Sequence, residues 1–286
     1  MLSIQIVKTI GEMQETAERF RREGKIIAVV PTMGYLHRGH ARLIEHARSR
    51  ADVVITTIFV NPAQFAPNED FNRYPRDFDH DTIIASEAGT DFIFFPDAKE
   101  MYPKEFSSSV EVKGASGILE GAFRPILFRG VTIVVTKLFH ITKPHIAIFG
   151  QKDAQQAFIL RRMVNDLNFD IDITIVPIVR EEDWLALSSR NVYLNEIERK
   201  NALVLYRSLQ HAAKRIQDGE HHASAVCVEM ENIIQSGNPS RIDYIAFVNP
   251  EKFEEVENIE PPEVLAVLAV RFGTTRLIDN IRIQVE

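Results

Sequence analysis

The fold of this chain is decided by the stretch Val30-Pro31-Thr32-Met33-Gly34-Tyr35-Leu36-His37-Arg38-Gly39-His40. Apolar residues 26–30 lead into it and predict a buried strand, and residues 41–50 after it predict a helix. A helix N-terminus attracts phosphate through its N–H groups and partial positive charge, so this strand, turn and helix indicate a nucleotide-binding site. His37 and His40 are three residues apart and can project from one side of the first helical turn.

Composition narrows the class of protein. The 286 residues can bury a large core, and no apolar stretch approaches the roughly 20 residues that span a bilayer. Residues 1–14 lack the pattern of a signal peptide. The net charge of −7 argues against nucleic-acid binding, so local positive groups must attract any anionic ligand. Cys227 is the only cysteine, which excludes an intrachain disulfide and suits a reducing cytoplasm.

Apolar segments alternate with helical patterns through the first two thirds of the chain. The expected strands are residues 26–30, 53–60, 92–95, 145–149 and 171–179, and the expected helices are residues 9–22, 41–50, 77–88, 131–141 and 155–165. The strands are apolar on both faces, which predicts an α/β fold with a parallel sheet covered by helices. Its ligands should bind beyond the carboxyl ends of the strands. Residues 61–75 are expected to form a long loop, and residues 101–117 a short hairpin or extended arm.

The pattern changes after Asn191. Helical residues 196–217 and 224–235 are followed by strand-like residues 242–248, 264–272 and 277–285. Helices followed by strands predict a smaller α+β unit with an antiparallel sheet. We therefore expect two domains, residues 1–183 and residues 184–286.

Polar residues follow the ends of the predicted strands. After the second strand, the amides of residues 61–64 could hydrogen-bond a carboxylate or hydroxyl, although a turn held by Asn61 explains them equally well. After the fourth, Lys152 offers a point charge for phosphate, and a capped helix start is the alternative. After the fifth strand, the two hydroxyls and the guanidinium of residues 188–190 could clamp an anion. A surface loop without a ligand is the alternative interpretation.

Two clusters of side chains, one of histidines and one of aspartates, could instead bind a metal ion. His37 and His40 could bind a metal, but no third ligand is evident nearby. Asp77, Asp79 and Asp81 open a predicted helix, where carboxylates either favour the helix dipole or hold Mg²⁺ beside phosphates.

Together these stretches resemble the pantothenate synthetase (pantoate–β-alanine ligase) family. The resemblance rests on Pro31-Thr32-Met33-Gly34 with His37-x-Gly39-His40, Phe59-Val60-Asn61-Pro62-x-Gln64-Phe65, Tyr74-Pro75-Arg76, Phe149-Gly150-x-Lys152-Asp153-x-Gln155-Gln156, Val179-Arg180-Glu181, Ser188-Ser189-Arg190-Asn191-x-Tyr193-Leu194 and Arg276-Leu277-Ile278-Asp279-Asn280. These motifs follow the family's order over nearly the whole chain, which makes the set highly specific.

The resemblance implies a Rossmann-like nucleotidyltransferase domain and a smaller C-terminal lid domain. It also implies an ATP-dependent, AMP-forming ligase that joins pantoate to β-alanine through a pantoyl adenylate and releases pyrophosphate. Mg²⁺ would accompany ATP. The protein would be a cytoplasmic homodimer whose partners are these small molecules, with no nucleic acid and no membrane.

Residue roles are carried over from the family position by position. The implied ATP-binding residues are Met33, Gly34, Tyr35, Leu36, His37, Arg38, Gly39, His40, Gly150, Gln151, Lys152, Asp153, Val179, Leu187, Ser188, Ser189 and Arg190. Among them His40 is the expected proton donor, and the other implied catalytic residues are His37, Lys152 and Arg190. Gln64 and Gln156 would bind pantoate, Gln64 would also contact β-alanine, and Asp81 would contact the metal.

Two positions depart from the family pattern, and two other functions stay open. Leu127 stands where the family commonly has histidine, and Trp184 where it commonly has glycine. A nucleotidyltransferase of this fold could instead act on another acid or on a phosphate. The two departures also allow a nucleotide sensor without catalytic activity.

Overall fold

The computed structural model describes residues 4–286, which divide into two compact units. Of the described residues, the first unit comprises residues 4–150 and Gln156–Pro177, and the second comprises Gln151–Gln155 and Ile178–Glu286. Unlike the expected boundary at 183/184, this division groups residues 151–155 and 178–183 with the C-terminal strands. One reason is that the Asn280 side-chain amide donates to the backbone oxygens of Gln151 and Lys152, at 3.0 Å each. The functional boundary at 183/184 stays a prediction.

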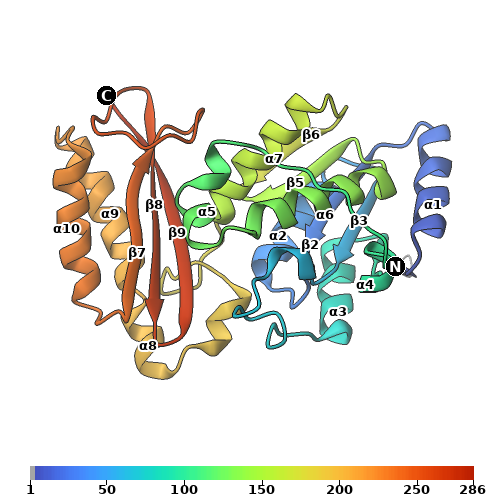
Figure 1. The fold of residues 1–286 in the computed structure, drawn as a ribbon, viewed down its shortest axis with the longest axis horizontal. Coiled ribbons are helices and arrows are strands. Elements are labelled where there is room, and N and C mark those ends of the chain that lie inside the picture. The colour runs from blue at the N-terminus through green and yellow to red at the C-terminus, as the bar shows by residue number, and fades with distance from the viewer. Residues whose placement is uncertain (1–3) are drawn as a thin grey trace. The chain divides into compact units, whose positions relative to one another are not determined.

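The first unit is built on a six-stranded parallel sheet in the order β1-β4-β3-β2-β5-β6. Figure 1 labels β2, β3, β5 and β6 of this sheet. The strands are β1 Gln5–Val7, β2 Ile27–Thr32, β3 Val53–Ile58, β4 Phe92–Phe94, β5 Ile146–Gly150 and β6 Asp172–Val176. The chain runs outward from β2 through β3 to β4, then returns to β5 on the other side of β2. This reversal places a topological switch point at the carboxyl ends of β2 and β5, where sheets of this kind bind ligands.

Helices cover both faces of this sheet, as the sequence predicts. They are α1 Ile10–Arg22, α2 Arg38–Arg48, α3 Phe78–Ala88, α4 Ala98–Met101, α5 Glu120–Phe123, α6 Leu127–Thr142 and α7 Ala154–Asp166. Buried residues of α1, α6 and α7 share one apolar cluster with the sheet, and those of α2 and α3 share another. β3 is buried along its whole length, which explains its uninterrupted apolar and β-branched sequence.

The second unit packs helices against an antiparallel sheet in the order β7-β8-β9. Its elements are α8 Glu196–Asn201, α9 Val204–Gln217, α10 Ala223–Gln235, β7 Arg241–Val248, β8 Glu263–Phe272 and β9 Thr275–Gln284. The predicted α+β character is confirmed. The single helix expected over residues 196–217 is wrong, because α8 has no buried residue and the core-facing stripe begins only at Ala202.

Residues 101–117 contain no paired strand in the described chain, so the hairpin alternative is wrong and the extended arm describes them better. Thr132 anchors this arm by donating its hydroxyl proton to the backbone oxygen of Val110, at 2.5 Å.

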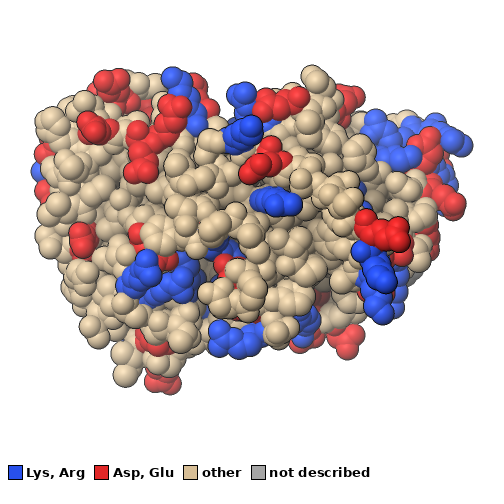
Figure 2. All heavy atoms as spheres, in the orientation of Figure 1, with Lys and Arg blue, Asp and Glu red and all other residues tan. Residues whose placement is uncertain are grey.

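Basic and acidic side chains are intermixed on the face shown in Figure 2. Within residues 4–286, no helix is both long enough and apolar enough to cross a membrane.

Candidate functional site

The turn after β2 has a backbone that only a few residue types adopt easily. Gly34 and Tyr35 have φ angles of +84° and +51°, in the left-handed region. Asp81 of α3 holds the turn by accepting the backbone N–H groups of Tyr35 at 2.9 Å and Leu36 at 2.5 Å. A Cβ atom on Gly34 would lie 2.9 Å from Asp81 Oδ2, so glycine is required here for space as well as for conformation.

Asp81 is 1% exposed. Burial raises the pKa of this carboxyl above its usual value, while the two backbone N–H groups favour the charged form. Through these two hydrogen bonds Asp81 stabilises the turn after β2. Among residues 4–286, no group of three or more His, Cys, Asp or Glu side chains is arranged to hold a metal. The predicted contact of Asp81 with Mg²⁺ stays a prediction.

His37 and His40 form a reciprocal cap at the start of α2. His37 Nδ1 accepts the backbone N–H of Gly39 at 3.1 Å, and His40 Nδ1 accepts that of His37 at 3.3 Å. The two rings lie 4.1 Å apart between centroids. Because a backbone N–H can only donate, each neutral imidazole carries its proton on Nε2. The pair therefore presents N–H donors at a helix N-terminus, where negative charge is favoured.

Gln64 lies next to the turn after β2, as expected for the ends of neighbouring parallel strands. It ends the short helix η1 Pro62–Gln64 and is 8% exposed. Its amide Nε2 lies 3.2 Å from the sulfur of Met33. The structure thus brings together Met33, which was predicted to bind nucleotide, and Gln64, which was predicted to bind the acid substrate.

Helix α6 supports Gln64 through a close backbone contact that the sequence did not reveal. A Cβ atom on Gly130 would lie 2.3 Å from the oxygen of Ala63 and 2.5 Å from Cα of Gln64. Glu69 and Arg124 also tie this region together, through two hydrogen bonds of 2.6 and 2.8 Å. No motif signals these contacts, because each joins residues more than fifty positions apart.

Leu127, one of the two departures from the family pattern, opens α6. It is 7% exposed and belongs to the main apolar core of the first unit. The leucine therefore packs in the core, where a histidine would require a polar partner.

The remaining predicted residues of the first unit lie beside β5. Gly150 is the last residue of β5, and Gln156 lies in the first turn of α7. Both therefore lie at or just after the carboxyl end of β5, the strand that borders the switch point. This position is the one that the sequence pattern predicts for ligand-binding residues.

In the second unit, predicted residues occupy three neighbouring segments. Gln151, Lys152 and Asp153 form the short helix η3 Gln151–Asp153, where Lys152 Nζ lies 3.9 Å from Asp153 Oδ2. Val179 accepts the backbone N–H of Leu187 at 3.0 Å, which brings these two together.

Ser188 caps the short helix η4 Ser189–Tyr193 by accepting the backbone N–H of Arg190 at 3.2 Å. The hydroxyl of Ser188 thus fixes the backbone of the segment that is predicted to clamp an anion. Ser189 is buried and Arg190 half-buried.

Trp184, the second departure, adopts a backbone conformation that suits glycine, with φ +74°. Its ring is stacked on Tyr206 with centroids 5.1 Å apart, and 57% of the residue is exposed. The Arg180 guanidinium lies 4.5 Å from the centroid of the same Tyr206 ring.

Arg180 also donates two hydrogen bonds to the carboxylate of Asp279. Burial raises the pKa of Asp279, and the charge of Arg180 opposes this shift.

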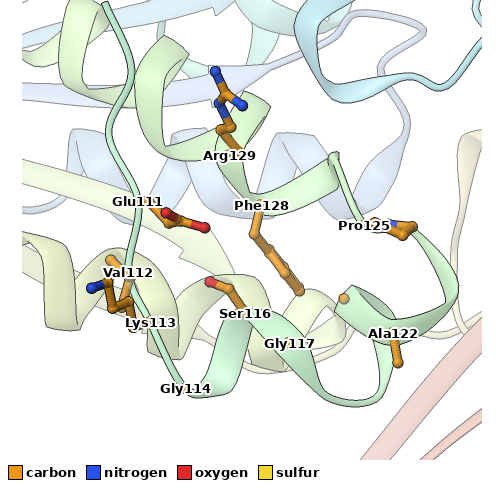
Figure 3. Close-up of a pocket in the computed structure, with 11 residues that line it drawn as sticks. Glu111, Val112, Lys113, Gly114, Ser116, Gly117, Ala122, Pro125, Phe128 and Arg129 are labelled. Carbon is orange, nitrogen blue, oxygen red and sulfur yellow. The ribbon is translucent and has the colours of Figure 1, made fainter.

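A cavity of about 470 Å³ lies beside the first turn of α6 (Figure 3). Phe128 and Glu111 point toward its centre, whereas Arg129 points away. Ser116 Oγ is buried there without a hydrogen-bond partner. None of the predicted substrate-binding residues lines this cavity, so we assign it no part in the reaction.

Comparisons with known proteins agree with this arrangement. The family model described as pantoate-beta-alanine ligase matches residues 5–282. A pantothenate synthetase of Caldicellulosiruptor saccharolyticus is 50% identical over 280 residues, covering 98% of this chain and 99% of its own. The solved pantothenate synthetase of Thermus thermophilus is 42% identical with a TM-score of 0.92, covering 97% of this chain and 99% of its own.

A further solved structure is the pantoate-beta-alanine ligase of Francisella tularensis, described as complexed with beta-gamma ATP and beta-alanine. It is 33% identical with a TM-score of 0.82, and the match covers 97% of each chain. Sequence and fold thus agree with these relatives over nearly the whole length of the chain. The chain belongs to the pantoate–β-alanine ligase family.

Proposed function

We propose that this enzyme condenses (R)-pantoate with β-alanine and consumes ATP, giving pantothenate, AMP and pyrophosphate. The observation that carries the proposal is the pair of imidazoles at the start of α2 with Gln64 beside the same turn. The donors suit a phosphate, and the neutral amide suits a small hydroxy acid. The ligands described for the Francisella tularensis relative support ATP and β-alanine as substrates.

The reaction has two transfers. A carboxylate oxygen of pantoate attacks the α-phosphorus of ATP, and the bond to pyrophosphate breaks, which leaves pantoyl adenylate. The amine of β-alanine then attacks the acyl carbon, AMP leaves, and the nitrogen loses a proton. Both steps depend chiefly on positioning the reactants and stabilising the developing charge.

Our residue assignments follow the family pattern. His40 and His37 donate from Nε2 to phosphate oxygens, and Lys152 and Arg190 add positive charge. The proposed ATP-binding residues are Met33, Gly34, Tyr35, Leu36, His37, Arg38, Gly39, His40, Gly150, Gln151, Lys152, Asp153, Val179, Leu187, Ser188, Ser189 and Arg190. Gln64 and Gln156 hold pantoate, and Gln64 contacts β-alanine.

We propose that Mg²⁺ arrives with ATP, held mainly by phosphate oxygens and water. The described residues offer no cluster of acidic and imidazole ligands, and Asp81 already accepts two backbone N–H groups. Mg²⁺ commonly binds through substrate phosphates with few protein ligands, so this donor set fits. We further propose a homodimer that acts in the cytoplasm and binds neither nucleic acid nor membranes.

The proposal predicts exchange of labelled pyrophosphate into ATP that requires pantoate and Mg²⁺ but not β-alanine. The reversible first step alone produces this exchange. Absence of exchange with folded protein would overturn the adenylate mechanism. Exchange with another hydroxy acid but not with pantoate would instead assign a different substrate.

Replacing Gly130 with Ala is expected to raise the KM for pantoate about tenfold and to lower the free energy of unfolding by about 1–3 kcal/mol. The added Cβ meets backbone atoms of Ala63 and Gln64, which cannot rotate away. Gly11→Ala in α1 is the matched control, because nothing lies within 4 Å of the position that its Cβ would take. Steady-state kinetics and urea unfolding measure both effects. If both variants had the same KM for pantoate and the same free energy of unfolding, the close contact of Gly130 with Ala63 and Gln64 would not be needed.

A further inference from the structure

We propose that Tyr102 is a positioning residue that acts through Asn61 to fix the orientation of the Gln64 carboxamide. The Tyr102 hydroxyl donates to Asn61 Oδ1 at 2.8 Å. Asn61 Nδ2 in turn donates to Gln64 Oε1 at 3.0 Å. This proposal deepens the proposed function and rests on Gln64 as a substrate-binding residue.

The orientation of the Asn61 amide follows from two backbone groups whose roles are fixed. Asn61 Nδ2 lies 2.9 Å from the carbonyl oxygen of Gly130, which can only accept. Asn61 Oδ1 lies 3.2 Å from the backbone nitrogen of Ala63, which can only donate. A flipped Asn61 amide would oppose donor to donor and acceptor to acceptor, so it has one favourable orientation. Tyr102 must then donate to Oδ1, and the second N–H of Asn61 must point at Gln64.

These hydrogen bonds determine which atom of the Gln64 amide is available to contact a ligand. Gln64 Oε1 is engaged by Asn61, so Gln64 Nε2 lies at the other end of the amide, beside Met33 Sδ. A thioether is only a weak acceptor. We infer that an oxygen of the acid substrate replaces the sulfur as the acceptor. Gln64 thus selects a carboxylate or hydroxyl oxygen, and its oxygen does not serve as the main contact for an ammonium group.

Tyr102 suits this role because it is held in place and stays protonated. It follows α4 directly, and its ring meets Phe106 edge to face with centroids 5.1 Å apart. A second aromatic ring, Phe59, lies 6.2 Å away. Burial raises the pKa of the Tyr102 phenol above its usual value, so the hydroxyl remains a donor at neutral and moderately alkaline pH.

Tyr102→Phe tests the proposal. We expect the KM for pantoate to rise about three- to tenfold, the effect of losing one hydrogen bond in a network. The kcat and the KM for ATP should change less than about twofold, because Gln64 binds the ground state and transition state alike. Tyr244→Phe removes a hydroxyl from β7 in the second unit and is the control, with no expected change in the KM for pantoate.

A double-mutant cycle separates positioning from general destabilisation. In a Gln64→Ala background, Tyr102→Phe should leave the KM for pantoate unchanged within about twofold, because no amide remains to orient. An equal rise in both backgrounds would overturn the proposal. So would a Tyr102→Phe enzyme whose KM for pantoate matches that of the unmodified enzyme.

A spectroscopic measurement tests the network independently of activity. The side-chain ¹⁵N–¹H₂ signals of Gln64 are identified by their loss in Gln64→Ala, and we expect them to shift in Tyr102→Phe. Unchanged signals would overturn the proposal. If the unmodified enzyme showed no pantoate-dependent exchange, the proposed function would fail, while these signals would still decide whether Tyr102 orients Gln64.

Discussion

Replacing His40 with Ala is expected to slow pantoyl-adenylate formation about 10²–10⁴-fold while the protein stays folded. The imidazole accepts the backbone N–H of His37 through Nδ1, so the neutral ring carries its proton on Nε2. In the proposed reaction this Nε2–H stabilises the charge that develops on phosphate. The N-terminus of α2 adds its partial positive charge at the same place. Pantoate-dependent pyrophosphate exchange measures the rate, and thermal unfolding measures the stability.

The same helix supplies the matched control for His40→Ala. His46 lies in the last turn of α2, far along the helix from the cap, so His46→Ala should retain the exchange rate. The His40 change also removes one capping hydrogen bond, which costs about 0.5–2 kcal/mol of stability. A folded His40→Ala enzyme with near-normal exchange would remove His40 from the proposed chemistry. Equal rate losses in both variants would point to a disturbed helix instead.

The fold was largely predictable because its strands are buried on both faces. The continuous apolar runs of β2, β3 and β5 identified the parallel sheet and the edge at which ligands bind. β1 was missed because it has three residues, of which only Val7 is buried. The break between α8 and α9 was missed because helical propensity continues across it, whereas burial does not.

The sequence predicted which residue types make up the candidate site. It did not predict the residues from distant elements that hold them in place. The candidate ligand-binding residues His40, Gln64 and Lys152 follow strand ends, so the local sequence was enough to select them as candidates. Their supports come from distant elements: Tyr102 reaches back 41 positions to Asn61, and the Asp81 carboxylate reaches back 45 to Leu36. Only the folded chain brings such pairs together. Asp81 illustrates the difference, because the family resemblance implies a metal contact there, while only the folded chain shows that its carboxylate also holds the turn after β2.

Replacing Asp279 with Ala is expected to lower the free energy of unfolding of the second unit by about 3–5 kcal/mol. Asp279 is 3% exposed and accepts two hydrogen bonds from Arg180, at 2.7 and 2.9 Å. Its removal leaves the guanidinium, whose side chain is 12% exposed, without this carboxylate. A buried charge that loses its partner costs far more than the pair contributes. Urea unfolding followed by fluorescence measures the loss.

Trp184 makes this measurement specific, since it is the only tryptophan and is stacked on the Tyr206 ring that Arg180 contacts. The control is Glu263→Ala, which breaks a 2.6 Å pair with Arg282 on β8 and β9. Arg282 is exposed and Glu263 is only half-buried, so the loss of this pair should cost no more than about 1 kcal/mol. Asp279→Asn keeps the shape and one acceptor, and its expected loss lies between these two. If all three variants unfolded at the same urea concentration, the buried pair would not stabilise the unit.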